Sequence, residues 1–199
     1  ILGSIIILSR QTLILTIFLF FGNIFLGLLS PFAWNTLSQY QQNRILTFLN
    51  PEKDPLGVAY QIIQSKTAIG SGGLFGKGWG QGTQTHLKFL PVQESDFILS
   101  VIGEELGFVT VAMVLLIIGY FIMQIVKFAF LSKDRFSSLA LIGIATIFLA
   151  HVFINTAMTV GLIPVKGLPF PFISAGGSFL MTSFLMTGIV LKLSVNYTD

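Results

Sequence analysis

Four stretches of the chain are apolar over a length that matches a membrane-spanning helix. A helix needs about 20 mainly apolar residues to cross the hydrocarbon core of a bilayer. The stretches cover residues 12–33, 97–128, 136–160 and 177–195. Residues 1–9 are compatible with the end of an earlier span, so we treat residues 1–33 as one unit. The pattern therefore predicts an all-α integral membrane protein with about four transmembrane helices.

The connections between these stretches predict an orientation. The short connection 129–135 carries Lys133 and Arg135 against Asp134, and Lys127 lies just before it. Short loops rich in Lys and Arg stay on the cytoplasmic side of a membrane. We therefore expect residues 129–135 and the tail 196–199 inside, and the connections 34–96 and 161–176 outside.

The large connection 34–96 is expected to hold structure of its own. About sixty residues are too many for a structureless loop in a compact protein. Residues 60–69 place Ile62, Ile63 and Ile69 near one face, which is typical of a helix in the membrane interface. The thirteen residues from Gly70, GSGGLFGKGWGQG, contain seven glycines and predict a tightly turning backbone.

Composition supports a membrane protein and excludes several function classes. Hydrophobic residues make up 53% of the 199 residues and charged residues only 10%, whereas soluble domains are about a quarter charged. Cysteine is absent and the two histidines are isolated, so a zinc cluster is not expected. The net charge of +3 is scattered, which excludes a nucleic-acid partner. The start, ILGSIIIL, is not typical of a signal peptide, and we expect the chain to be a piece of a longer protein.

The glycine-rich stretch does not match a nucleotide-binding loop. A Walker A motif requires Gly at position 71 and Ser or Thr at 78, where this chain has Ser71 and Gly78. Glycine backbone can still approach an anion closely, with Lys66 and Lys77 adding charge. One interpretation is thus a pyrophosphate site, formed by Lys66, Lys77, Ser71, Gly72 and Gly73. The other interpretation is a turn that packs on the membrane surface and leaves both lysines in water.

Carboxylates stand at the border of the second span. In an unbroken helix from Ser95, the residues Asp96, Ser100 and Glu104 would share one face. The α-carbons of Asp96 and Glu104 would then lie roughly 12 Å apart, beyond the ~5 to 9.5 Å of paired glycosidase carboxylates. One carboxylate acting alone is more plausible, with Glu104 or Glu105 in support. Alternatively, the two glutamates hold neighbouring helices together, and Asp96 with Ser95 caps the helix.

Two further polar features precede the last span. His151 and Asn155 are four residues apart in an apolar stretch, which favours hydrogen bonding between helices. The following loop is rich in Pro and Gly, and such irregular backbone must be buried in protein or line an aqueous cavity. Its candidate supporting residues are Ser174, Gly176 and Gly177.

Together these motifs resemble the SEDS family of bacterial membrane proteins, whose two best known branches are RodA and FtsW. The matching blocks are NPEKDPLG (50–57), QSKTAIGSGGLFGKGWGQGTQ (64–84), FLPVQESDFILSVIGEELGF (89–108) and GLIPVKGLPFPFISAGGS (161–178). The first two blocks look more like RodA, the branch of cell elongation. The resemblance implies the C-terminal part of a ten-helix fold.

The resemblance also implies a function and a place in the cell. Family members are peptidoglycan glycosyltransferases that polymerise lipid II on the outer face of the bacterial cytoplasmic membrane, and the essential aspartate aligns with Asp96. Lys66, Lys77 or a divalent cation, Mg or Mn, would neutralise the leaving pyrophosphate, and no organic cofactor is expected. The expected partner is a class B penicillin-binding protein. The chain departs from the family at Glu94 and Ser95, where His and Thr are usual, and at Lys166 and Ala175.

Two other functions remain open from the residues alone. Glu104, Glu105 and His151 inside the membrane would suit a transporter of the lipid-linked precursor. The apolar helices 97–128 and 136–160 would suit a scaffold that docks and activates the penicillin-binding protein.

Overall fold

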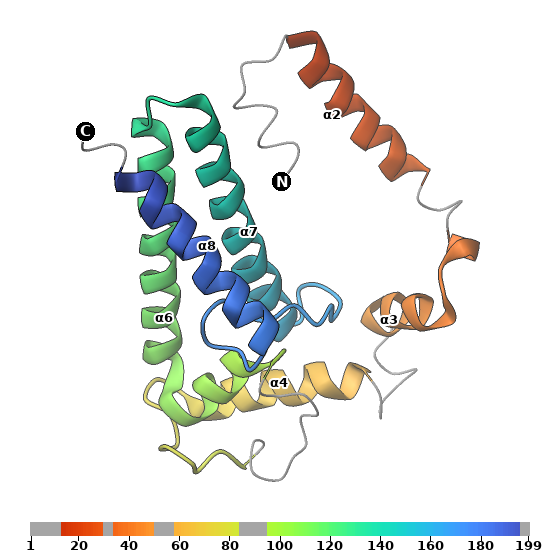
Figure 1. The fold of residues 1–199 in the computed structure, drawn as a ribbon. Coiled ribbons are helices and arrows are strands. Elements are labelled where there is room, and N and C mark those ends of the chain that lie inside the picture. Colours follow the sequence, from red (N-terminus) through yellow and green to blue (C-terminus); the bar gives the residue numbers. More distant parts are fainter. Residues whose placement is uncertain (1–12, 30–33, 50–57, 84–94, 196–199) are drawn as a thin grey trace.

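The chain folds entirely into helices and loops over the residues that the structure describes. The computed structural model describes residues 13–29, 34–49, 58–83 and 95–195. Figure 1 shows α6 (Ile98–Leu131), α7 (Arg135–Thr159) and α8 (Gly177–Val195) side by side, with α4 (Val58–Gly72) across their lower end. The large connection also holds the short 3-10 helix η1 (Trp34–Thr36) and α3 (Gln39–Leu49). No strand occurs in the four described segments.

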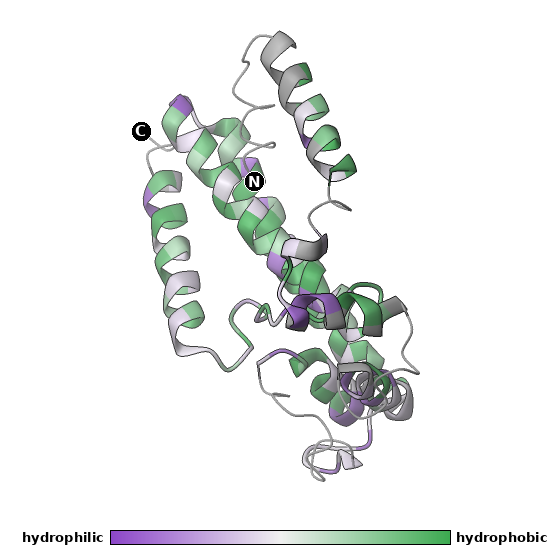
Figure 2. Cartoon of the chain, turned by 90° about the vertical axis from the view of Figure 1, so that its right-hand side faces the viewer, coloured by the Kyte–Doolittle hydropathy of each residue, from purple (hydrophilic) through white to green (hydrophobic). Residues whose placement is uncertain are grey.

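Three of the described helices are long and apolar enough to cross a membrane, namely α6, α7 and α8. In Figure 2 these helices are mainly green, because apolar side chains face outward as well as inward. Leu116, Phe153 and Met181 are 74%, 66% and 74% exposed, as expected for surfaces that lipid covers. The first predicted span, 12–33, coincides with α2 (Leu13–Leu28, 16 residues), whose neighbours 1–12 and 30–33 lie outside the described residues.

A tight turn joins α6 to α7. Asp134 caps α7 by accepting hydrogen bonds from the Ser137 backbone N–H (3.0 Å) and hydroxyl (2.8 Å). The Ser138 hydroxyl donates to the carbonyl of Ala129 at the end of α6 (2.7 Å). These local bonds satisfy backbone and side-chain groups that a helix end leaves unpaired. The two helices therefore run antiparallel and pack through a core that α8 completes, made of Ile122, Ile125, Leu141, Ala145, Phe148, Met186 and Val190.

The loop from α7 to α8 folds back onto the bundle rather than away from it. Phe172 stacks on Phe148, with ring centroids 5.5 Å apart, and contacts Phe121 and Phe184 edge-on. Phe170 is fully buried. These rings fix the loop against the middle of α6 and α7, at Phe121 and Phe148.

The spanning helix expected from residue 97 is not straight, because α6 begins at Ile98, after Asp96, and is kinked at Gly107, three residues beyond Glu104. Gly107 has φ 81° and ψ 175°, which is not a helical conformation. A Cβ at this position would overlap backbone atoms of Gly76 and Leu74. Figure 1 shows the short first part of α6, residues 98–106, turned against α4, while residues 108–131 form the long span. Glu104 therefore does not lie two turns deeper along a straight spanning helix.

Close backbone contact explains why α4 packs against this first part of α6. Gly72 faces Gly103, and a Cβ on Gly72 would overlap the Gly103 carbonyl oxygen. Small residues let two helices approach until their backbones touch. Ala68 is fully buried in the same contact layer, together with Phe97 and Met158.

Candidate active site

Asp96 lies in the turn that precedes α6 and is partly buried. Ser95 donates its hydroxyl hydrogen to Asp96 Oδ1 over 2.9 Å. No other hydrogen bond to this carboxylate occurs among the described residues, so Oδ2 is unpaired there. The N-cap of α6 is Phe97, without a side-chain cap. The alternative in which Asp96 and Ser95 cap the helix is therefore not what the structure shows.

Two buried side chains tie the backbone around Asp96 to the loop 161–176. Asn155 donates through Nδ2 to the carbonyl oxygens of Asp96 (3.0 Å) and Leu168 (2.8 Å). The Ser174 hydroxyl donates to the Ser95 carbonyl and accepts from the Phe170 N–H. Asn155 is fully buried and Ser174 is 6% exposed. Buried hydrogen bonds of this kind hold a segment in one position, because leaving their partners unpaired is costly.

The same loop passes directly beside the Asp96 carboxylate. Gly167 has φ 63°, and a Cβ there would lie 3.2 Å from Asp96 Oδ2. Glycine therefore serves this position for two reasons, the left-handed backbone and the short distance to the carboxylate. Lys166, next to it, is exposed.

His151 also contacts the loop, one helical turn before Asn155. Its Nδ1 lies 3.2 Å from the Pro169 carbonyl oxygen, which requires the proton on Nδ1. Its ring stacks on Phe179 of α8, with centroids 4.3 Å apart. Both polar residues of this α7 face thus bind the loop, and His151 links it to α8. Gly176 and Gly177 lie at the start of α8, where the Gly176 carbonyl accepts from Leu180.

A chain of hydroxyl groups connects α6, α4 and α7. The Ser65 hydroxyl lies 2.6 Å from both the Ser100 hydroxyl and the Thr159 carbonyl oxygen. A hydroxyl has one hydrogen to donate. Ser65 must therefore donate to Thr159 and accept from Ser100. Neither Ser65 nor Thr159 is among the residues predicted from the sequence, although Ser65 shares a helix face with Ile62 and Ile69 and so lies on the expected apolar side.

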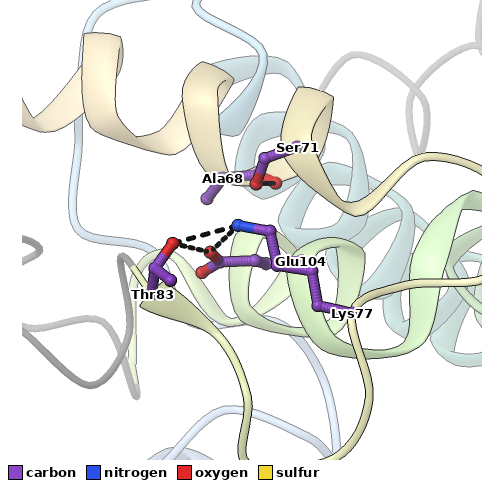
Figure 3. Close-up of polar contacts among 5 residues, drawn as sticks. All are labelled: Ala68, Ser71, Lys77, Thr83 and Glu104. Atoms are coloured by element: carbon purple, nitrogen blue, oxygen red, sulfur yellow. Dashed lines mark hydrogen bonds and ion pairs between the residues drawn. The ribbon is translucent and has the colours of Figure 1, made fainter.

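Glu104 binds Lys77 and Thr83 of the large connection. Figure 3 shows the Lys77 ammonium contacting Glu104 Oε1 (2.7 Å) and the Thr83 hydroxyl (3.0 Å), and Thr83 donating to the same carboxylate oxygen. Glu104 is fully buried. Glu105 Oε2 accepts from the backbone N–H of Gly80 at 3.1 Å. Both glutamates thus hold the glycine-rich loop on α6, which favours their structural interpretation.

The residues predicted to bind pyrophosphate do not form one group. Lys77 is engaged by Glu104, Gly72 packs on Gly103, and the Ser71 hydroxyl donates to the Ala68 carbonyl (Figure 3). The Gly73 carbonyl accepts from the Phe108 N–H. Lys66 differs, because it is exposed and its Nζ would lie 2.7 Å from a Cβ on Gly161. Lys66 and Asp96 therefore contact the same loop, at Gly161 and Gly167.

A model of FtsW, RodA and SpoVE, described as cell cycle proteins, matches residues 1–199. The chain belongs to this family. It is 46% identical over 157 residues to a probable peptidoglycan glycosyltransferase FtsW of Trichlorobacter lovleyi, covering 79% of this chain and 41% of that protein. It is 43% identical over 164 residues to the peptidoglycan glycosyltransferase MrdB of Escherichia coli K12, covering 82% and 44%.

A third relative and a solved structure extend this comparison. The peptidoglycan glycosyltransferase RodA of Treponema pallidum is 40% identical, with 79% of this chain and 36% of that protein covered. A chain from a structure described as "Structural coordination of polymerization and crosslinking by a peptidoglycan synthase complex" is 27% identical, with a TM-score of 0.76, and the match covers 98% of this chain and 53% of that one. The chain thus spans about two-fifths of the length of the curated relatives it matches.

Membership in the FtsW/RodA/SpoVE family confirms the resemblance drawn from the four sequence blocks. Together with three helices suited to cross a membrane, it makes the protein a multi-pass membrane protein. Relatives named FtsW and RodA match at similar identities, so the preference for the elongation branch stays a prediction. Of the matching blocks, the first (50–57), the last residue of the second (84) and the first six residues of the third (89–94) lie outside the described residues.

The described part of this family member holds no ready-made metal site. No group of three or more His, Cys, Asp or Glu side chains comes together in it. Mg²⁺ is usually held by one or two carboxylates together with substrate phosphates. Asp96 alone would supply one carboxylate, so the described residues do not by themselves make a cation site.

Proposed function

We propose that the protein containing this chain is a peptidoglycan glycosyltransferase that polymerises lipid II, with Asp96 as the general base. One observation carries the proposal. The backbone of Asp96 is fixed by Asn155, its Oδ1 is held by Ser95, and its Oδ2 has no partner among the described residues. A base needs such an arrangement, a fixed position with one oxygen available to the proton it removes.

The reaction follows from what a single carboxylate can do. Asp96 takes the proton of the 4-hydroxyl of the acceptor sugar as that oxygen attacks the anomeric carbon of the donor. The bond from this carbon to the lipid pyrophosphate breaks, and the pyrophosphate leaves with the electron pair. General-base catalysis contributes about 10² to 10⁴-fold to such a step.

Lys66 is the better of the two lysines for the leaving pyrophosphate. Its ammonium is exposed and free of ion pairs within the described residues, whereas Lys77 is held by Glu104. A cation near the leaving group stabilises the charge that develops there. No step is assigned to a divalent cation.

The proposed location is the outer face of the bacterial cytoplasmic membrane. The α6–α7 turn carries Lys133 and Arg135 and lies at the end of the bundle opposite to the start of α6 (Figure 1), which Asp96 precedes by two residues. The excess of basic residues favours the cytoplasm for that turn. Asp96 then faces outside, where the head group of lipid II is exposed.

Labelled lipid II and the purified full-length protein test this proposal. Asp96→Asn should lower the rate of glycan chain growth by about 10² to 10⁴-fold. Asp134→Asn is the matched control, because Asn is also a good helix N-cap, and it should polymerise normally. Full activity of Asp96→Asn would overturn the assignment of the base. Movement of the head group across the membrane without chain growth would favour the transporter instead.

A role in a complex is compatible with this activity. The solved relative belongs to a peptidoglycan synthase complex, and the exposed apolar faces of α6 and α7 offer room for a membrane helix of a partner. We propose a class B penicillin-binding protein as that partner. If helix-surface substitutions abolish cell growth while Asp96→Asn supports it, scaffolding alone explains the function better.

A further inference from the structure

The glycine-rich loop exposes two aromatic rings to an unusual degree. We call residues 73–80, GLFGKGWG, the aromatic loop. Phe75 and Trp79 are each 82% exposed, more than any other large apolar side chain in the described segments, and Leu74 is 62% exposed. In water such exposure is unfavourable. These side chains therefore require a partner or a lipid environment.

The loop that carries these rings is fixed by its backbone. The carbonyls of Gly73 and Leu74 accept from the N–H groups of Phe108 (2.9 Å) and Val109 (3.2 Å). In return, the N–H groups of Lys77 and Gly78 donate to the carbonyls of Glu104 (2.9 Å) and Glu105 (3.0 Å). The loop is thus hydrogen-bonded to α6 both before the kink, at Glu104 and Glu105, and after it, at Phe108 and Val109. This fixed backbone holds the two rings in their exposed positions.

The charge of the loop is turned inward. Lys77 is the one charged residue among residues 73–80, and its ammonium contacts the buried Glu104 and Thr83. The outer surface of the loop is left with Leu74, Phe75 and Trp79. Two backbone donors and two backbone acceptors of the loop are paired with α6, which is what irregular backbone near lipid requires.

The position of the aromatic loop indicates that lipid, and not water, surrounds its apolar side chains. Leu74 is bonded to Val109, and the long span of α6 begins at this level. Phe108, Val109 and Met113 are 59%, 44% and 55% exposed and start the apolar surface of that span. The surface of the loop is therefore continuous with a surface that faces lipid, at the depth where aromatic side chains gather in membrane proteins.

We propose that the aromatic loop is a membrane-interface anchor, in which Phe75 and Trp79 insert among the lipid head groups of the leaflet nearest Asp96. Because the loop is bonded to the first part of α6, the anchor sets the depth at which that part of α6 lies. This role does not depend on the glycosyltransferase activity.

Site-specific labelling measures the depth of the loop directly. The chain has no cysteine, so Phe75→Cys in the full-length protein, freed of any other cysteine, gives one site for an environment-sensitive fluorophore. In phosphatidylglycerol and phosphatidylethanolamine vesicles, the emission should shift to the blue. Lipids carrying a nitroxide near the head group should quench it about twofold more strongly than lipids carrying one deep in the chain, as expected at the interface. Trp79→Cys should behave alike.

Gln81→Cys is the matched control, because Gln81 is exposed and polar and follows Trp79 by two residues. Its label should emit as in water and be quenched by iodide. Iodide quenching of the Phe75 label equal to that of the Gln81 label would overturn the anchor. Shielding of the Phe75 label only after a purified penicillin-binding protein is added would overturn it too, in favour of a protein-docking surface.

Discussion

The two ends of the α6–α7 pair are built in different ways, although each must terminate the same two antiparallel helices. At the basic end, a short turn and local bonds are sufficient. Asp134 caps α7 three residues from Ser137, and Ser138 bonds to Ala129 nine residues away. All of these contacts are local in sequence. The charged side chains of the turn, Lys133, Asp134 and Arg135, are exposed.

At the Asp96 end, the contacts are long-range and buried. Ser174 binds Ser95 across 79 residues, Asn155 binds Asp96 across 59, and Ser65 binds Thr159 across 94. Closing such loops costs chain entropy, and burying polar groups is costly unless each is paired. Ending two helices does not require such long-range, buried hydrogen bonds, as the basic end shows. The difference indicates that the Asp96 end is built to hold a carboxylate and its neighbouring loop in one arrangement.

The largest effect should come from the buried ion pair. Lys77→Met removes the ammonium that contacts the fully buried Glu104 and should lower the free energy of unfolding by about 3–5 kcal/mol. Lys133→Met at the basic end removes an exposed lysine and should change it by less than about 0.5 kcal/mol. Unfolding of the full-length protein in detergent, followed by circular dichroism, compares the two variants.

The double variant Lys77→Met with Glu104→Leu separates the pair from the loop itself. It removes both charges, so most of the lost stability should return. If Lys77→Met were no more destabilising than Lys133→Met, the two ends would not differ in the way proposed here.

A smaller effect is expected from the kink. Gly107→Ala places a side chain at φ 81°, ψ 175°, where it also overlaps the aromatic loop. The backbone conformation alone should cost at least about 1–3 kcal/mol. Gly119→Ala lies in the straight span with nothing within 4 Å of its Cβ, and it should be neutral or stabilising by up to about 1 kcal/mol. Equal melting temperatures for the two variants would show that the kink is not fixed by Gly107.

The sequence predicts the helices and the basic end better than the Asp96 end. Apolar length alone marks α7 and α8, because crossing a bilayer imposes that length. The kink is missed, since one glycine in an apolar run is compatible with a helix. The feature that could have predicted the kink lies elsewhere in the chain, in the glycines of the aromatic loop that pack on it.

The partners of buried polar groups cannot be read from spacing. Glu104 meets Lys77 from 27 residues away, and nothing in either local sequence selects the other. Asp96 is identified as a candidate by the resemblance to the SEDS family, whose essential aspartate aligns with it, whereas the cost of a carboxylate at bilayer depth points to Glu104. The Oδ2 atom, which has no partner among the described residues, and the neighbouring Gly167 depend on tertiary contacts, which local sequence does not specify.

The smallest effect concerns the cap at the basic end. The Ser137 backbone N–H and then its hydroxyl hold the pKa of Asp134 below its ordinary value of 3.8. Because the folded pKa is the lower one, the cap contributes stability above the unfolded pKa and loses it as pH falls through the folded pKa. Ser137→Ala removes the hydroxyl donor but keeps the N–H. The pKa of Asp134, followed by carboxyl ¹³C NMR, should therefore rise part of the way toward 3.8. An unchanged pKa would mean that the backbone bond alone sets it, whereas a change in glycan synthesis would show that the two ends are coupled.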